Sequence, residues 1–192
     1  MTSDGTPTKR APEPLDQVQR FVNSLDLETG EEALETPEAL RDWFAERALM
    51  RADEPVTEGD LRRAVEVREG LRALLLANNG HPLDQQAVER LNRAASRAGL
   101  RLSFSPRDGG PALSPDVTGV DGALAELMAI ATRATHDGTW ERLKACLHES
   151  CLWAFYDHSK NRSGKWCKME ECGNVHKARA YRRRHRGQPA AS

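Results

Sequence analysis

All four cysteines of this 192-residue chain lie in one stretch near its C-terminus and form two pairs of equal spacing. Cys146 and Cys151 enclose four residues, Cys167 and Cys172 enclose another four, and fifteen residues separate the pairs. Two short cysteine loops at this separation are typical of a tetrahedral zinc site, because each loop presents two thiolates and the intervening segment folds back to join them. The sequence therefore predicts one structural zinc ion bound by Cys146, Cys151, Cys167 and Cys172.

Other uses of these cysteines stay open. Two disulfides or four unrelated buried thiols would also account for them, although a reducing compartment disfavours disulfides. One imidazole could replace a thiolate, and the candidates are His148, His158 and His176. A catalytic zinc ion would keep an open coordination position, so a site with four cysteines is expected to be structural.

A strongly basic segment follows the last cysteine. Seven of the ten residues from Lys177 to Arg186 are basic when His185 is included, and no helix breaker lies between His176 and Arg186. Basic side chains at helical spacing can neutralise phosphates, and arginine can bind guanine in a bidentate manner. The residues predicted to contact nucleic acid are Arg162, Lys165, Asn174, Lys177, Arg179, Arg182, Arg183, Arg184 and Arg186. A solvated terminal helix, or a tether to the acidic remainder of the chain, is the alternative.

The distribution of charge also favours a polyanionic partner. The formal net charge is −1, but residues 140–192 hold twelve Lys or Arg against five Asp or Glu, whereas the remainder holds sixteen against twenty-four. An acidic body joined to a basic module suggests that the module binds a polyanion. No apolar run is long enough to span a bilayer and no signal peptide is evident, so a cytoplasmic location and no membrane partner are expected.

The residues before the cysteines predict a helical domain that positions the module. The clearest helix start is Thr57, which forms a near capping box with Asp60, and Asn78-Asn79-Gly80 is a typical helix end. Thr36-Pro37 and Asp84 are further good starts. Expected helices span residues 14–25, 36–49, 57–77, 84–98 and 121–135.

Two short β segments are expected. Leu100, Leu102 and Phe104 alternate with polar residues, which predicts a half-buried strand that pairs through the turn at 107–110 with residues 112–117. A short helix over 139–143 leads into Cys146, and the apolar residues 152–156 predict a strand packed over the metal.

The predicted fold is mainly α with a small β-hairpin. A disordered arm (1–13) precedes a helical domain (14–138), a zinc module of short strands and a basic C-terminal helix follows (139–186), and the chain ends in a disordered tail (187–192).

The cysteine stretch resembles the CGNR zinc finger family. It matches in the pattern C-x4-C-x15-C-x4-C and in CGNVHKARAYRRR, although Val175 stands where the signature arginine would fall. The upstream FVNSLDLETG and TPEALRDWF are similar to the start of the helical ABATE domain that precedes this finger. The resemblance covers residues 15–186. It implies a bacterial, stress-induced transcription regulator with an N-terminal regulatory domain and a DNA-binding finger, the four cysteines being ligands and Gly173 and Asn174 belonging to the signature.

The leading hypothesis is therefore a regulator that binds double-stranded DNA, with a helical domain that dimerises, binds a small-molecule effector, or both. An RNA-binding module, with Trp153, Tyr156, Trp166 and Tyr181 stacking on bases, and a protein-interaction adaptor are the alternatives. No phosphate loop, G-x-S-x-G or H-E-x-x-H motif is present, so no enzymatic activity is expected. An effector pocket, if present, is expected near Trp43, Phe44 and the hairpin at 100–117.

Overall fold

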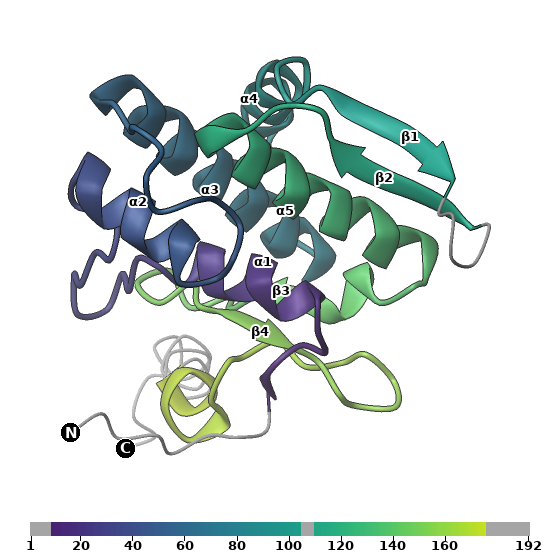
Figure 1. The fold of residues 1–192 in the computed structure, drawn as a ribbon. Coiled ribbons are helices and arrows are strands. Elements are labelled where there is room, and N and C mark those ends of the chain that lie inside the picture. The colour runs from purple at the N-terminus through teal and green to yellow at the C-terminus, as the bar shows by residue number, and fades with distance from the viewer. Residues whose placement is uncertain (1–8, 105–109, 176–192) are drawn as a thin grey trace, which may run out of the picture.

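The computed structural model describes residues 9–104 and 110–175, and Figure 1 shows that this part of the chain is mainly helical. Two antiparallel hairpins accompany the helices, so the predicted fold class is confirmed. The helices are α1 (Leu15–Val22), α2 (Pro37–Ala45), α3 (Glu58–Asn78), α4 (Gln85–Ala95) and α5 (Gly119–His136). The strands are β1 (Leu100–Phe104), β2 (Pro111–Pro115), β3 (Leu143–Ala145) and β4 (Ala154–Tyr156), with a 3-10 turn at Trp140–Arg142 and a π-helical turn at Met169–Gly173.

The helix starts follow the predicted capping residues. Thr36 accepts a hydrogen bond from the Ala39 backbone N–H, and Asp84 caps α4 in the same way. Thr57 and Asp60 form a full capping box at the start of α3. Each cap satisfies amide groups that have no partner within the helix. No helix in the described ranges is both long and apolar enough to cross a membrane.

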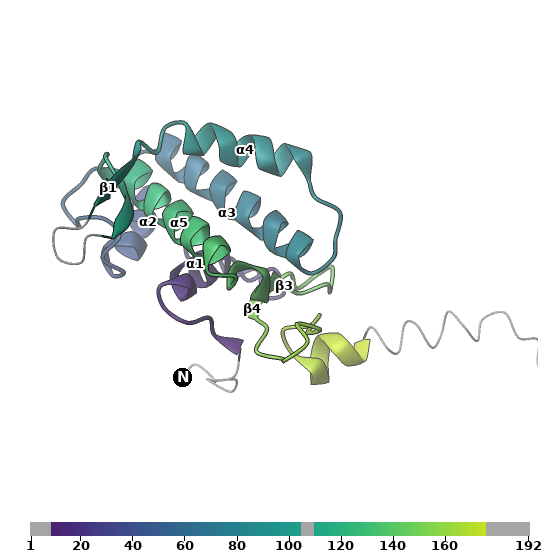
Figure 2. The same ribbon diagram turned by 90° about the vertical axis from the view of Figure 1, so that its right-hand side faces the viewer.

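The core lies between α1, α2, α3 and α5, with α4 packed on the outer side of α3 (Figure 2). Phe21, Trp43 and Phe44 form an aromatic cluster with ring centroids 5.5–5.8 Å apart. Gly70 lets α4 approach α3 closely, because a Cβ at this position would meet the Leu91 side chain at 2.7 Å. Gly70 therefore allows α3 and α4 to pack closely against each other.

Three helices end earlier than expected. The helix α1 stops at Val22 rather than at residue 25. The helix α2 stops at Ala45 because the chain turns away through Ala48, whose φ is 54°, and Ala48 is exposed. The helix α4 stops at Ala95 rather than at residue 98. The short helix expected over 139–143 is a 3-10 turn followed by β3.

The hairpin of β1 and β2 forms with the expected pairing but without the expected burial. Leu102 lies opposite Leu113 in the antiparallel register. Leu102 and Phe104 nevertheless remain 64% and 70% exposed, because the hairpin extends past α5 and nothing in the described part of the chain covers this part of β1 (Figure 1). The prediction of a half-buried strand is therefore wrong.

Residues 9–13 also depart from the predicted disordered arm. Ala11 is buried, and its N–H donates to the Gln19 side chain at 2.7 Å. The Gln19 amide in turn donates to the Lys9 carbonyl, which fixes the segment on α1. A low apolar content predicted disorder, but a buried alanine, the Gln19 side chain and the Arg10–Asp16 ion pair hold this segment on α1.

Candidate metal centre

The four cysteines lie together in one buried cluster. Their sulfur atoms all fall within 4.8 Å of one another, with Cys151 Sγ 3.5 Å from Cys167 Sγ and Cys167 Sγ 3.7 Å from Cys172 Sγ. Zinc bound tetrahedrally at Zn–S distances of about 2.3 Å would separate its sulfurs by roughly 3.8 Å. The cluster therefore fits one zinc ion with four thiolate ligands.

None of the histidines in the described ranges joins the cluster. The His148 ring contacts the Ser150 hydroxyl at 3.1 Å, and the His158 ring contacts the Arg10 carbonyl at 3.0 Å. His176 lies outside the described residues. Four thiolates without an imidazole leave no ligand position for water, which is the arrangement of a structural zinc site.

Local backbone geometry positions each cysteine pair. The first loop closes where the Cys146 N–H donates to the Trp153 carbonyl, and the Cys151 N–H donates to the His148 carbonyl. The second loop is the π-helical turn that ends at Gly173. A Cβ at Gly173 would meet Met169 Sδ at 2.4 Å, so a larger residue directly after the last cysteine would displace the Met169 side chain.

The crowded thiols influence one another's ionisation. Hydrogen bonds from Cys151 and Cys167 lower the pKa of Cys146 to about 2. The hydrogen bond between Cys151 and Cys146 raises the pKa of Cys151 to about 12. Hydrogen bonding to Cys146 and Cys151 also raises the pKa of Cys167, and burial raises that of Cys172. Zinc binding must displace the thiol protons and compensate the buried negative charge of the thiolates.

The β3–β4 hairpin joins the metal cluster to the helical body, which comprises α1 to α5. The ring of Phe155 packs on the cysteines, whereas its neighbours Ala154 and Tyr156 belong to the core of the helical body together with Leu143 and Ala145. Successive strand residues face opposite sides, so one short strand serves both clusters. The finger and the body thus share a continuous hydrophobic core.

Buried and half-buried amide and guanidinium side chains of the body bind backbone groups of the finger. Asn23 both donates to and accepts from the Ala154 backbone, at 2.9 and 2.7 Å. Asn79 donates to the carbonyls of Ala145 and Lys165, at 2.8 and 3.0 Å. Further bonds of this kind come from Gln19, Arg72 and Asn78. The finger is therefore held in one orientation on the body.

Sequence reasoning missed these residues. It interpreted Asn78 and Asn79 only as a helix end, and it did not assign Arg68 and Arg72, which are buried on the inner face of α3. Two arginines four residues apart beside Leu71 and Leu75 are a signal that could have indicated buried polar partners, because an arginine is rarely buried unless it is paired. Glu69, between the two arginines in the sequence, pairs with both. Nothing local identifies the distant partners, which are Ser24, Glu32 and Leu152.

A buried ion pair holds the turn between the two cysteine pairs. Lys144 Nζ lies 2.9 Å from Asp157 Oδ2, and both side chains are almost fully buried. Burial acts to raise the pKa of Asp157, but hydrogen bonds from Ser159, Lys144 and Gly164 outweigh it and keep the pKa well below its usual range. A Cβ at Gly164 would lie within 3.0 Å of that buried carboxylate, so position 164 requires glycine.

Three of the predicted nucleic-acid contacts lie within the described residues, and all three are exposed. Arg162 adopts a positive φ of 51° and forms an ion pair with Glu141. Lys165 is exposed beside the second cysteine pair, while the Asn174 side chain donates to the Glu170 carbonyl. The other six lie outside the described residues, namely Lys177, Arg179, Arg182, Arg183, Arg184 and Arg186.

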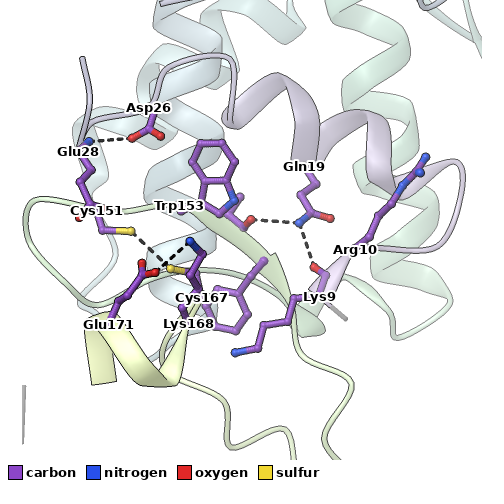
Figure 3. A pocket seen from close by; sticks show the side chains of 12 residues that line it. Lys9, Arg10, Gln19, Asp26, Glu28, Cys151, Trp153, Cys167, Lys168 and Glu171 are labelled. Atoms are coloured by element: carbon purple, nitrogen blue, oxygen red, sulfur yellow. Dashed lines mark hydrogen bonds and ion pairs between the residues drawn. The ribbon is translucent and has the colours of Figure 1, made fainter. Parts of the chain in front are cut away.

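A cleft of about 270 Å³ separates part of the finger from the body (Figure 3). Its walls include Cys151 and Cys167 from the finger and Gln19 from α1, and the Lys168–Glu171 ion pair lies on one side. The ammonium group of Lys9 lies 4.9 Å from the centre of the Phe155 ring. The segment before α1 therefore contacts the finger directly.

Comparison with known families agrees with this architecture. Residues 142–185 match the model described as CGNR zinc finger, and residues 16–137 match ABATE, described as Putative stress-induced transcription regulator. Among curated proteins, none matches the chain. Because the ABATE model covers well over half of the chain and the finger model follows it directly, this chain belongs to the ABATE family and carries a C-terminal CGNR zinc finger with a site for one zinc ion.

Proposed function

We propose that the chain is a transcription regulator that binds double-stranded DNA through its finger. The strongest support is the turn between the cysteine pairs, which presents Lys160, Arg162 and Lys165 to solvent. The buried Lys144–Asp157 pair and the zinc cluster hold the backbone of this turn from two sides. Phosphate binding gains from cationic groups whose backbone is already ordered, because less conformational entropy is lost on binding.

The basic run from Lys177 to Arg186 continues directly from the metal site in the sequence. We propose that this run supplies most of the phosphate contacts and that the turn adds a second row. A single module of this size offers little contact area, so specific recognition is expected to require two copies of the chain.

Double-stranded DNA is favoured over RNA by the burial of the aromatic residues. Binding single-stranded RNA requires aromatic faces that bases can reach. Tyr156 is buried in the shared core, and Trp153 and Trp166 are partly buried against the metal cluster. Packing thus accounts for Tyr156 and Trp166, while Trp153 borders a cavity on the body.

Fluorescence anisotropy of the zinc-loaded chain tests the proposal, using duplex DNA, structured RNA and single strands over a salt series. Duplex affinity should fall steeply with salt concentration, because each neutralised phosphate releases a counterion. Replacing Arg182, Arg183 and Arg184 with Ala should weaken duplex binding and reduce the salt slope by about one per lost contact.

The matched control removes the same charge from the body, through Ala substitutions at the exposed Arg51, Arg97 and Arg101. This control should leave both affinity and slope nearly unchanged. Tighter binding of RNA than of duplex DNA would contradict the proposal, as would equal effects of the two triple variants.

A further inference from the structure

Three arginines from different elements meet at a cavity on the body beside the finger. Arg10 precedes α1, Arg20 lies on α1 and Arg47 follows α2, and all three line a cavity of about 370 Å³. Although the body is acidic as a whole, no carboxylate lines this cavity. The amides of Gln19 and Asn23 in its wall already bind the Ala154 backbone, so the guanidinium groups are its available donors.

The carboxylates that pair with these arginines lie outside the cavity lining, and only that of Asp16 is buried. Asp16 pairs with Arg10 and Arg20 at 2.6 and 3.0 Å, and Arg10 also pairs with the exposed Glu13 at 3.3 Å. The nearest acid to Arg47 is Glu46, which is largely exposed and lies 3.3 Å away, so solvent screens that pair. Burial lowers the pKa of Arg47, and the nearby charge of Arg20 lowers it further. A bound anion would relieve this repulsion.

Two polar atoms near this cavity lack hydrogen-bond partners within the protein. Arg47 Nε and Gln17 Oε1 are the buried side-chain atoms in the described ranges for which no partner is found. Arg47 lines the larger cavity, whereas Gln17 lines a smaller adjoining one of about 180 Å³ together with Glu13 and Asp16. Buried polar groups are nearly always satisfied, so the unpartnered Arg47 donor favours a ligand that carries a hydrogen-bond acceptor. The Gln17 oxygen is itself an acceptor and does not support an anion site.

Aromatic surface completes the cavity. The guanidinium of Arg47 stacks on Trp43 at 3.9 Å from the ring centre and donates to the Trp43 carbonyl, which fixes its orientation. Trp153 enters from the finger, only two residues after Cys151, and also borders the neighbouring cleft with Arg10 (Figure 3). Two indole rings beside three guanidinium groups suit a planar ring that carries an anionic group.

We propose that this cavity binds a small aromatic compound bearing a carboxylate or phosphate group. The anionic group lies between Arg20 and Arg47, and the ring lies against Trp43 and Trp153. This site is distinct from the zinc cluster and does not depend on DNA binding. The sequence predicted an effector pocket near Trp43, Phe44 and the β1–β2 hairpin. Trp43 lines this cavity, whereas Phe44 is in the core and the β1–β2 hairpin is not part of the lining.

Isothermal titration of the zinc-loaded full-length chain tests the site with benzoate, phenyl phosphate, inorganic phosphate and uncharged benzamide. Benzoate or phenyl phosphate should bind at least tenfold more tightly than either inorganic phosphate or benzamide, and the better of the two identifies the anionic group. Arg47→Gln and Arg20→Gln should each weaken this binding at least tenfold. The control is Arg41→Gln, which removes an arginine of α2 that also pairs with an adjacent acid.

Three results would overturn the proposal. One is the absence of any titration signal for benzoate and phenyl phosphate at 10 mM, measured with the wild-type chain while its thermal unfolding transition is intact. Another is binding that survives both Arg47→Gln and Arg20→Gln. The third is a loss of duplex DNA affinity in these variants without any effect on the ring anions, which would place the arginines in a nucleic-acid interface instead.

Discussion

The two hairpins of this protein have similar pairing and opposite surroundings. Both are isolated two-stranded antiparallel sheets, but all six residues of β3 and β4 are buried, whereas β1 exposes Leu102 and Phe104. A two-stranded hairpin is marginally stable alone in water. The stability of each hairpin therefore depends on the contacts that the remainder of the chain makes with it.

The β3–β4 hairpin is stabilised from both faces. The metal cluster covers Phe155, the helical core covers Ala154 and Tyr156, and Asn79 and Asn23 bind its backbone. The β1–β2 hairpin accepts a hydrogen bond from Arg133 at the Leu113 carbonyl and contacts α5 mainly through β2. The alternation of side chains predicts a strand in either case, but distant residues decide whether its face is buried.

The largest expected effect comes from removing the metal. Cys167→Ser, or chelation of the wild-type chain, should remove a large share of the roughly 10–16 kcal/mol that zinc binding contributes to folding in small zinc modules. Because the finger shares its core with the body, the loss should lower the thermal midpoint of the whole chain and expose residues 143–175 to hydrogen exchange. Zinc content, calorimetry and exchange measure these changes.

His148→Ala is the matched control for the ligand assignment, since its imidazole lies in the first cysteine loop but contacts Ser150. It should retain one zinc ion per chain. Loss of zinc in this variant, or full retention in Cys167→Ser, would contradict the four-cysteine site.

Breaking the buried ion pair should have the next largest effect. Lys144→Met leaves the Asp157 carboxylate buried without its cation and should lower the free energy of unfolding by about 3–5 kcal/mol at pH 7. Lys165→Met, at an exposed site in the same module, should change it by less than about 0.5 kcal/mol. Denaturant unfolding of the zinc-loaded chains measures both, and equal effects would show that the pair contributes nothing specific.

The pH dependence of this pair has a definite sign. The pKa of Asp157 is lower in the folded chain than its ordinary value of about 3.9, so its stabilisation is fully present above that value. It is lost as the pH falls through the folded pKa, and it is constant between pH 5 and 8.

The backbone bonds of Asn79 should contribute less. Asn79→Ala leaves the carbonyls of Ala145 and Lys165 without this donor and should destabilise the chain by about 2 kcal/mol, at roughly 1 kcal/mol for each bond. Asn92→Ala removes an exposed asparagine of α4 and should be nearly neutral. A neutral Asn79→Ala would mean that water replaces the donor and that the finger is less firmly held than proposed.

The parts that the sequence predicted are those specified locally. Thr57, Asp60 and Asp84 cap helices through bonds within three residues, and the cysteine spacing already implies two loops around one metal ion. These features depend on neighbours in the chain, so a linear pattern contains them.

The parts that it did not predict depend on partners far away in the chain. Asn79 ends a helix locally, yet its amide binds residues 66 and 86 positions away. Arg72 joins α3 to both Val22 and Leu152. Such contacts form only once the helices have packed, and no spacing rule identifies which carbonyl a buried amide reaches.

The smallest expected effect is at Phe104, and it sharpens the contrast between the hairpins. Phe104→Ala should change the free energy of unfolding by less than about 0.5 kcal/mol because the ring is 70% exposed. The matched Phe155→Ala removes a buried ring from the other hairpin and should cost about 3–5 kcal/mol. Both are measured by denaturant unfolding at several protein concentrations. If Phe104→Ala lowered the free energy of unfolding by more than about 1 kcal/mol in a way that depends on protein concentration, the conclusion that this face of β1 is uncovered would be contradicted. Only a second chain that packs on β1 could give the ring that contribution.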